Sequence, residues 1–168
     1  ATIAQLGDDP AARALAERVL EVRTKTLPED HPDLQAARHN LAATMHSLGD
    51  LQGARALQER VLEVLAKTLP EEHPNLQGAR QNLAATMHSL GDLQGARALE
   101  ERVLEVLTRT LPSQHPDLQG ARQNLATTIA SLGDMQSARA LQERALEVLS
   151  ETLPEEHPDL QAARLNLA

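Results

Sequence analysis

The chain has 168 residues, 16 basic and 24 acidic for a net charge of −8, and it contains no aromatic residue and no cysteine. An acidic surface repels phosphates and offers no rings for base stacking, which argues against a nucleic-acid partner. Without cysteine there is no disulfide, thiolate nucleophile or cysteine-ligated zinc. The apolar runs are too short to span a membrane, and the first residues do not resemble a signal peptide, so we expect a cytoplasmic protein.

A unit of 42 residues repeats along the chain, and 168 residues equal four times its length. Asn-Leu-Ala begins at Asn40, Asn82, Asn124 and Asn166, and Leu-Pro and His-Pro recur at the same interval. A fixed period of this length indicates a repeat architecture. We divide the chain, as one domain over 1–168, into a partial unit 1–32, full units 33–74, 75–116 and 117–158, and a partial unit 159–168.

Each unit is predicted to hold two helices. In the first partial unit, residues 1–6 correspond to the end of a first helix, Gly7 to Asp9 to a turn, and Pro10 to the first turn of a second helix. In the next unit, apolar residues at helical spacing predict a first helix over about 33–48 and a second over about 51–68. Gly49 and Asp50 fit the turn between them.

The connector between units is short and contains two prolines, as at Pro70 and Pro74, which end one helix and start the next. The histidine before the second proline is expected to help cap the following helix. Helix pairs that cannot bury their apolar faces alone must stack on their neighbours. The pattern therefore predicts an all-α fold, a right-handed α-solenoid of stacked antiparallel helix pairs.

These residues resemble a known family. The run from Asn40 to Met45, the turn at Gly49 and the small residue Ala54 are similar to the tetratricopeptide repeat, and the 42-residue length with a linker such as His31-Pro32-Asp33 resembles the kinesin light chain type. The resemblance implies a superhelix whose concave face, lined by the first helix of each unit, receives peptides. It does not identify a partner.

One departure from the family pattern is an arginine inside the apolar stripe of the first helix. These arginines are Arg38, Arg80, Arg122 and Arg164, and the second helices carry Gln58, Glu100 and Gln142 in their own stripes. An unpaired buried guanidinium is costly. We therefore expect each arginine to bond the polar residue on the second helix of its own unit.

The side of the first helix opposite its core stripe supplies the candidate binding residues. An asparagine amide can donate to and accept from a peptide backbone at the same time. The alternative for the asparagines is a bond to a neighbouring helix that stabilises stacking. The candidates are Asn40, Asn82, Asn124 and Asn166, with His39, Gln81, Gln123, His46 and His88 beside them.

Nothing in the sequence predicts a catalytic centre, a metal site or a cofactor. His39 and His46 are seven residues apart, about 10 Å along a helix, too far to share an ion. No phosphate-binding glycine loop or nucleophile elbow is present. We expect a non-enzymatic scaffold that binds a protein or peptide, with basic segments favoured, and no nucleic-acid or membrane partner. The alternative is a structural module that self-associates head to tail through its uncapped ends.

Overall fold

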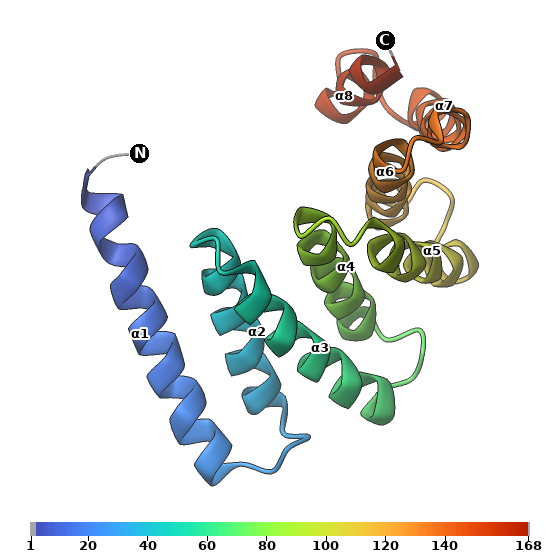
Figure 1. The fold of residues 1–168 in the computed structure, drawn as a ribbon. Coiled ribbons are helices and arrows are strands. Elements are labelled where there is room, and N and C mark those ends of the chain that lie inside the picture. The colour runs from blue at the N-terminus through green and yellow to red at the C-terminus, as the bar shows by residue number, and fades with distance from the viewer. Residues whose placement is uncertain (1–2, 168) are drawn as a thin grey trace. The chain divides into compact units, whose positions relative to one another are not determined.

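A computed structural model describes the backbone of residues 3–167; side chains are described from residue 11 onward, except those of residues 152, 159, 166 and 167. Over this range the chain forms eight α-helices and no strand (Figure 1). They are α1 (Ile3–Thr26), α2 (Pro32–Ser47), α3 (Leu51–Thr68), α4 (Pro74–Ser89), α5 (Leu93–Thr110), α6 (Pro116–Ser131), α7 (Met135–Thr152) and α8 (Pro158–Leu167). The predicted all-α fold class is confirmed. In the first full unit the predicted helix bounds are correct to within one residue.

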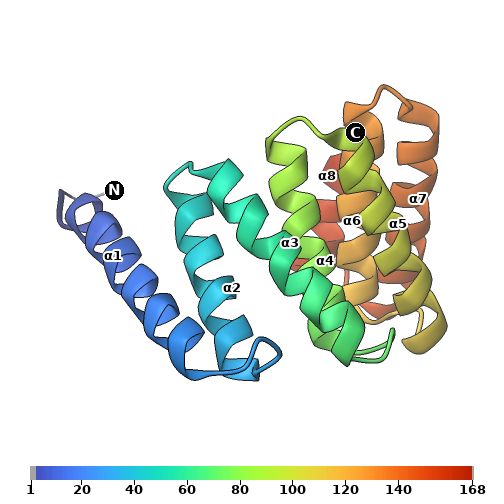
Figure 2. The same ribbon diagram turned by 60° about the horizontal axis from the view of Figure 1, so that its bottom comes forward.

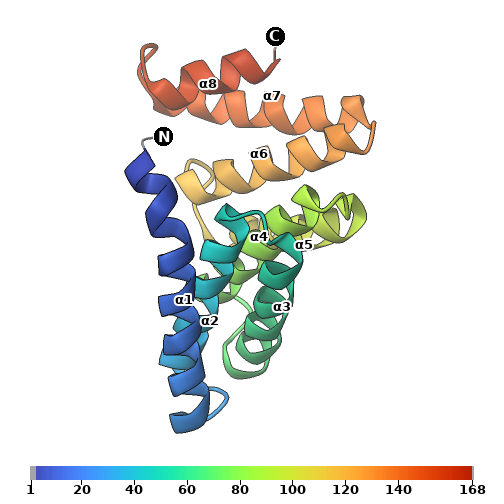
Figure 3. The same cartoon turned by 60° about the vertical axis from the view of Figure 1, so that its left-hand side comes forward.

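The chain divides into two compact units, residues 1–91 with α1 to α4 and residues 92–168 with α5 to α8. In the first unit each helix packs against the next, and the helices run alternately up and down (Figure 2). In the second unit α5 packs on α6, α6 on α7 and α7 on α8, and Figure 3 shows the last three as successive layers. The single continuous solenoid over 1–168 stays a prediction.

Helix ends are fixed by side-chain caps that recur with the repeat. Asp50 accepts a hydrogen bond from the backbone N–H of Gly53 at 3.0 Å, and Gly49 has φ +82°, a left-handed conformation that glycine adopts without strain. At the other turn, Nδ1 of His31 and of His73 accepts from the N–H two residues on, each at 3.1 Å. The expected capping role of these linker histidines is confirmed.

The core consists of leucines from the first helices packed against small residues. Leu34, Leu76 and Leu118 are 1% exposed, and Ala54 and Ala96 on the second helices are fully buried. Because alanine adds so little bulk, the helix axes approach closely enough for leucines to interdigitate. The apolar stripes thus face one another inside each unit, as their spacing predicts.

The N-terminal turn does not form as predicted. The backbone is helical from Ile3 through Gly7 and Pro10, so α1 is one helix in place of a short remnant, a turn and a second helix. At the equivalent Gly49 the chain turns because a full first helix precedes it and packs back onto the second. Among the described residues no preceding helix packs back onto α1, so nothing offsets the cost of a turn at Gly7.

The arginine prediction is wrong in its partner. Arg38 is buried, as expected, but its guanidinium donates to Glu29 in the preceding linker at 2.8 Å and to Gln35 at 3.4 Å. Arg80 repeats the arrangement with Glu71 at 2.9 Å and Gln77 at 3.2 Å. A glutamate in an open linker keeps part of its hydration while it pairs with the arginine, which a buried amide on the second helix could not do.

Candidate functional site

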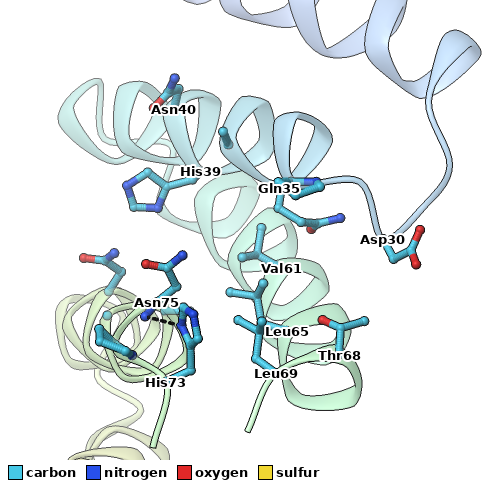
Figure 4. A pocket seen from close by; sticks show the side chains of 16 residues that line it. Asp30, Gln35, His39, Asn40, Val61, Leu65, Thr68, Leu69, His73 and Asn75 are labelled. Atoms are coloured by element: carbon cyan, nitrogen blue, oxygen red, sulfur yellow. Dashed lines mark hydrogen bonds between the residues drawn. The ribbon is translucent and has the colours of Figure 1, made fainter.

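A cavity of about 660 Å³ lies in the first unit between α2, α3 and α4 (Figure 4). The helices α2 and α4 are the first helices of successive repeats, and α3 packs against both of them. Repetition of the helix pair therefore produces the cavity, which lies within the range of typical ligand sites. Its lining residues are Asp30, Pro32, Gln35, Ala36, His39, Asn40, Val61, Leu65, Thr68, Leu69, His73, Pro74, Asn75, Gly78, Ala79 and Asn82.

One wall of the cavity is apolar. Val61, Leu65 and Leu69 follow one another along α3 and its C-terminal end at spacings of four residues (Figure 4). Val61 is buried, while Leu65 and Leu69 are partly exposed. Such a row can take up an apolar side chain of a ligand and remove it from water.

The other wall is polar and comes from the first helices. His39 on α2 and Asn75 on α4 lie across the cavity from the apolar row (Figure 4). Nδ1 of His73 is already used as a cap, since it accepts from the N–H of Asn75. The exposed imidazole of His39 has no such role, so this wall offers polar groups next to the apolar row.

A second cavity of about 210 Å³ adjoins this polar wall. His39 and Asn82 line both cavities, and the smaller one adds His46, Gln58 and Thr86 with two alanines. Nε2 of His46 and Oε1 of Gln58 are buried and make no hydrogen bond within the described part of the chain. Buried polar atoms without a partner are costly, so this end of the surface is suited to receive a hydrogen-bonding group.

The candidate residues from the sequence fall into three groups. Asn40, Asn82, His39 and His46 line the two cavities, although Figure 4 shows the Asn40 side chain pointing outward from α2. Gln81 and His88 lie on α4 and line neither of these two cavities. Gln123 and Asn124 are exposed on α6 in the second unit, and the side chain of Asn166 lies outside the described residues.

The asparagine side chains that the structure describes in this row do not bond a neighbouring helix. Among the described residues, the amides of Asn40, Asn82 and Asn124 make no hydrogen bond, and all three are exposed. Only their backbone carbonyls are engaged, as where Asn82 accepts from Thr86 at 3.2 Å. The stacking alternative therefore lacks a contact, and the amides are accessible to a ligand.

The apolar wall was not predicted as part of a site. Helical spacing places Val61 and Leu65 in the apolar stripe of the second helix predicted over about 51–68, and such a stripe is expected to be covered by neighbouring helices. The stripe on the second helix is wider than its neighbours cover, so Leu65 remains partly exposed in the cavity. The width of that stripe is the feature of the sequence from which Leu65 could have been predicted to line the cavity.

Other site types can be checked against the described part of the chain. Within it, no group of three or more histidine, aspartate or glutamate side chains could hold a metal ion. No described helix combines the length and apolar character that crossing a bilayer requires.

Comparisons with known proteins agree with this architecture. Tetratricopeptide repeat models match residues 1–67, 33–109 and 119–159. The nearly identical TPR-like repeats of a Podosopora anserina protein assigned to the kinesin light chains superpose with a TM-score of 0.90 at 34% identity, over 97% of this chain and 77% of that one. A single-residue variant of that protein has a TM-score of 0.91 with the same identity and coverage.

A further solved structure is also similar. BtubC (BKLC) from P. vanneervenii superposes with a TM-score of 0.82 at 25% identity, over 97% of this chain and 65% of that chain. No curated protein sequence matches this chain.

The fold and the matched models define a helical-repeat protein, and the chain belongs to the tetratricopeptide repeat family. Within that family it is a kinesin light chain-like repeat protein, which confirms the resemblance seen in the sequence. Its fold is that of a TPR solenoid, and this fold supports a role as a protein-interaction or repeat scaffold.

Proposed function

We propose that the chain is a non-enzymatic cytoplasmic scaffold that binds an extended peptide segment of a partner protein between α2 and α4. The observation that carries the proposal is the cavity of about 660 Å³, in which the apolar row of Val61, Leu65 and Leu69 faces the first-helix wall. An apolar wall opposite exposed amides suits an extended peptide, because its side chains and its backbone N–H and C=O groups point in different directions.

The two walls have different tasks. The amide of Asn82 can donate to a peptide carbonyl and accept from a peptide N–H, which holds the backbone whatever the side chains are. The leucine row takes one apolar side chain and sets a preference at that position. The net charge of −8 favours peptides with flanking basic residues through long-range attraction.

The test begins with peptides selected from a random display library against the full chain. The best peptide is titrated into labelled protein, and amide shifts are mapped. We expect the largest shifts on the cavity-lining faces of α2 and α4 and on the C-terminal half of α3. Shifts confined to α7 or to the outer side of α3 would contradict the proposal.

A pair of variants sharpens this test. Asn82→Ala removes the amide in both cavities and is expected to weaken the peptide on the order of tenfold, the value of one hydrogen bond that is lost. Gln52→Ala removes an exposed amide at the start of α3 that lines neither cavity, and it should leave the affinity unchanged. Equal losses in the two variants would argue against the groove.

A second candidate function is self-association with another copy of the chain, favoured by the surface of α1. Leu15 is 66% exposed, Val19 38% and Val22 54%. Their repeat equivalents in α3 include Val61 and Val64, which are 5% and 7% exposed because helices cover them on both sides. The apolar stripe of α1 is thus the face that a second copy would bury.

Sedimentation velocity over a wide concentration range tests this candidate. Self-association predicts a sedimentation coefficient that rises with concentration and a Val19→Glu variant that stays monomeric. A monomer at every concentration in both proteins would remove the candidate and leave the peptide groove unaffected.

A further inference from the structure

One linker in the second unit lacks the acid that the others share. In three repeats the linker glutamate stands nine positions before its arginine and accepts a hydrogen bond from it: Glu29 from Arg38 at 2.8 Å, Glu71 from Arg80 at 2.9 Å and Glu155 from Arg164 at 3.0 Å. At the equivalent position between α5 and α6 the residue is Ser113. The serine cannot supply a carboxylate to the arginine that follows it.

The arginine of this repeat is nevertheless buried. Arg122 is 5% exposed, and its guanidinium donates from Nη1 to Oε1 of Gln119 at 3.0 Å. Burial, followed by the charge of Arg144, lowers the pKa of Arg122. No carboxylate within the described residues forms an ion pair with it. A guanidinium in this position is largely shielded from solvent and has no carboxylate of the described chain to bind.

The linker backbone at Ser113 is held in the same way as in the repeats that have the linker glutamate. The side-chain amide of Gln119 donates to the carbonyl of Ser113, just as the amide of Gln35 donates to the carbonyl of Glu29. The linker backbone therefore sits in the same place relative to the arginine in both repeats. What differs is the side chain at this position and hence the local charge.

A second arginine faces the same place. In the first unit, Arg60 of α3 donates from Nε to Oε1 of Glu29 at 2.7 Å, so two arginines share one carboxylate. The repeat equivalent of Arg60 is Arg144 on α7. Arg144 is exposed and makes no hydrogen bond or ion pair among the residues that the structure describes. Two cations thus flank Ser113 without the acid that joins them elsewhere.

We propose that the linker between α5 and α6 is a carboxylate-binding site, in which Arg122 and Arg144 together hold a carboxylate that Ser113 does not provide. The guanidinium of Arg122 presents a planar pair of donors, which matches the two oxygens of a carboxylate, and Arg144 adds a donor from the side. The site lies in the second unit and does not depend on the groove between α2 and α4.

A carboxylate ligand can reach this site from solvent, and the acidic side chain nearest to Arg144 does not block it. The Glu29 side chain is 44% exposed while bound to its two arginines, so a carboxylate at the equivalent place can arrive from solvent. Glu147 is the nearest acidic competitor along α7, since it is the equivalent of Glu63. Arg60, however, bonds Glu63 at 2.7 Å and Glu29 at the same time. Pairing of Arg144 with Glu147 therefore does not close the site.

The experiment follows the arginine Nε–H signals of the full chain by NMR at constant ionic strength. Sodium acetate is the first probe, and chloride is reduced as acetate rises. We expect saturable shifts at Arg122 and Arg144 and none at Arg80, which is already paired with Glu71. A linear drift at Arg122 that is equal to the drift at Arg80 would overturn the proposal.

The source of the carboxylate is distinguished by a second probe. An N-acetylated, C-amidated Gly-Glu-Gly peptide is compared with its Gly-Gln-Gly analogue. Binding of the glutamate peptide more tightly than acetate indicates a side chain of a partner protein, and equal affinity indicates small carboxylate ions. Equal shifts with the glutamine analogue would overturn carboxylate recognition.

A variant pair separates the site from general charge effects. Ser113→Glu supplies the carboxylate from within the chain and is expected to weaken acetate binding at Arg122 on the order of tenfold or more. Ser113→Gln has the same size without the charge and should still bind acetate. Binding that survives Ser113→Glu, or that is lost equally in both variants, would contradict the assignment.

Discussion

The carboxylate of Glu29 accepts a hydrogen bond from Nε of Arg60 at 2.7 Å, although the two residues are 31 positions apart in the chain. The same carboxylate receives Arg38, so one linker residue fastens the helix that follows it to the second helix of the same repeat. This contact makes the linker part of the packed structure. It also links the stability of the repeat to the charge of one side chain.

That charge predicts a pH dependence. The hydrogen bond from Arg38 and the contact with Arg60 lower the pKa of Glu29 from 4.5 to about 2. The folded state thus favours the charged form. The stabilisation is fully present above pH 4.5 and is lost as the pH falls toward 2. We expect the difference in unfolding free energy between wild type and Glu29→Gln to shrink over that interval in urea titrations. A difference independent of pH would refute this.

Substitution of the buried arginine by methionine should change the unfolding free energy in opposite directions in repeats with and without the linker glutamate. Arg122→Met removes a buried charge that has no acid partner and is expected to raise the unfolding free energy by about 1 kcal/mol. Arg80→Met breaks the pair with Glu71 and is expected to lower it. Urea unfolding of the two variants checks the prediction, and destabilisation of equal size in both would contradict it.

The cap histidines should be replaceable by other caps but not by alanine. His73→Ala removes the Nδ1 that accepts from Asn75 and is expected to lower the unfolding free energy by about 1 kcal/mol. His73→Asn keeps a side-chain acceptor at this position and should recover most of the loss. Thermal unfolding monitored by circular dichroism measures both, and equal melting temperatures for the two variants would exclude a capping role.

Two glycines inside first helices offer a stabilising change. A Cβ atom built at Gly78 or at Gly120 would meet nothing within 4 Å, and neither residue has a left-handed backbone. Alanine, already present at the equivalent Ala36, should therefore stabilise each helix by about 0.5 to 1 kcal/mol. Chemical denaturation of Gly78→Ala and Gly120→Ala tests this, and a loss of stability in either variant would contradict the prediction.

The repeat pattern predicted most of the fold because local signals agree with packing. The apolar spacing, the Gly49–Asp50 turn and the linker prolines each define a helix bound that the structure confirms for α2 and α3. The N-terminal turn was predicted from sequence equivalence alone. It failed at Gly7 because a turn depends on the helix that packs behind it, and no such helix precedes Gly7 among the described residues.

The site was predicted in part. Helix geometry placed His39 and Asn82 on the open side of the first helices, and both line cavities. The partner of Arg38 could not be found in this way, because Glu29 is acidic, lies in a linker and reads as solvated surface. Contacts between a stripe residue and a linker depend on the path of the linker, which helical periodicity does not contain.

The most direct test of the central claim, that a peptide lies between α2 and α4, is to close that space with one side chain. Ala36 is exposed on α2 and lines the cavity, whereas Ala66 is exposed on α3 and does not. Calorimetric titration of the selected peptide should show affinity reduced on the order of tenfold or more by Ala36→Lys and unchanged by Ala66→Lys, with both variants folded. Undiminished binding to Ala36→Lys, or equal losses in the two, would contradict the account.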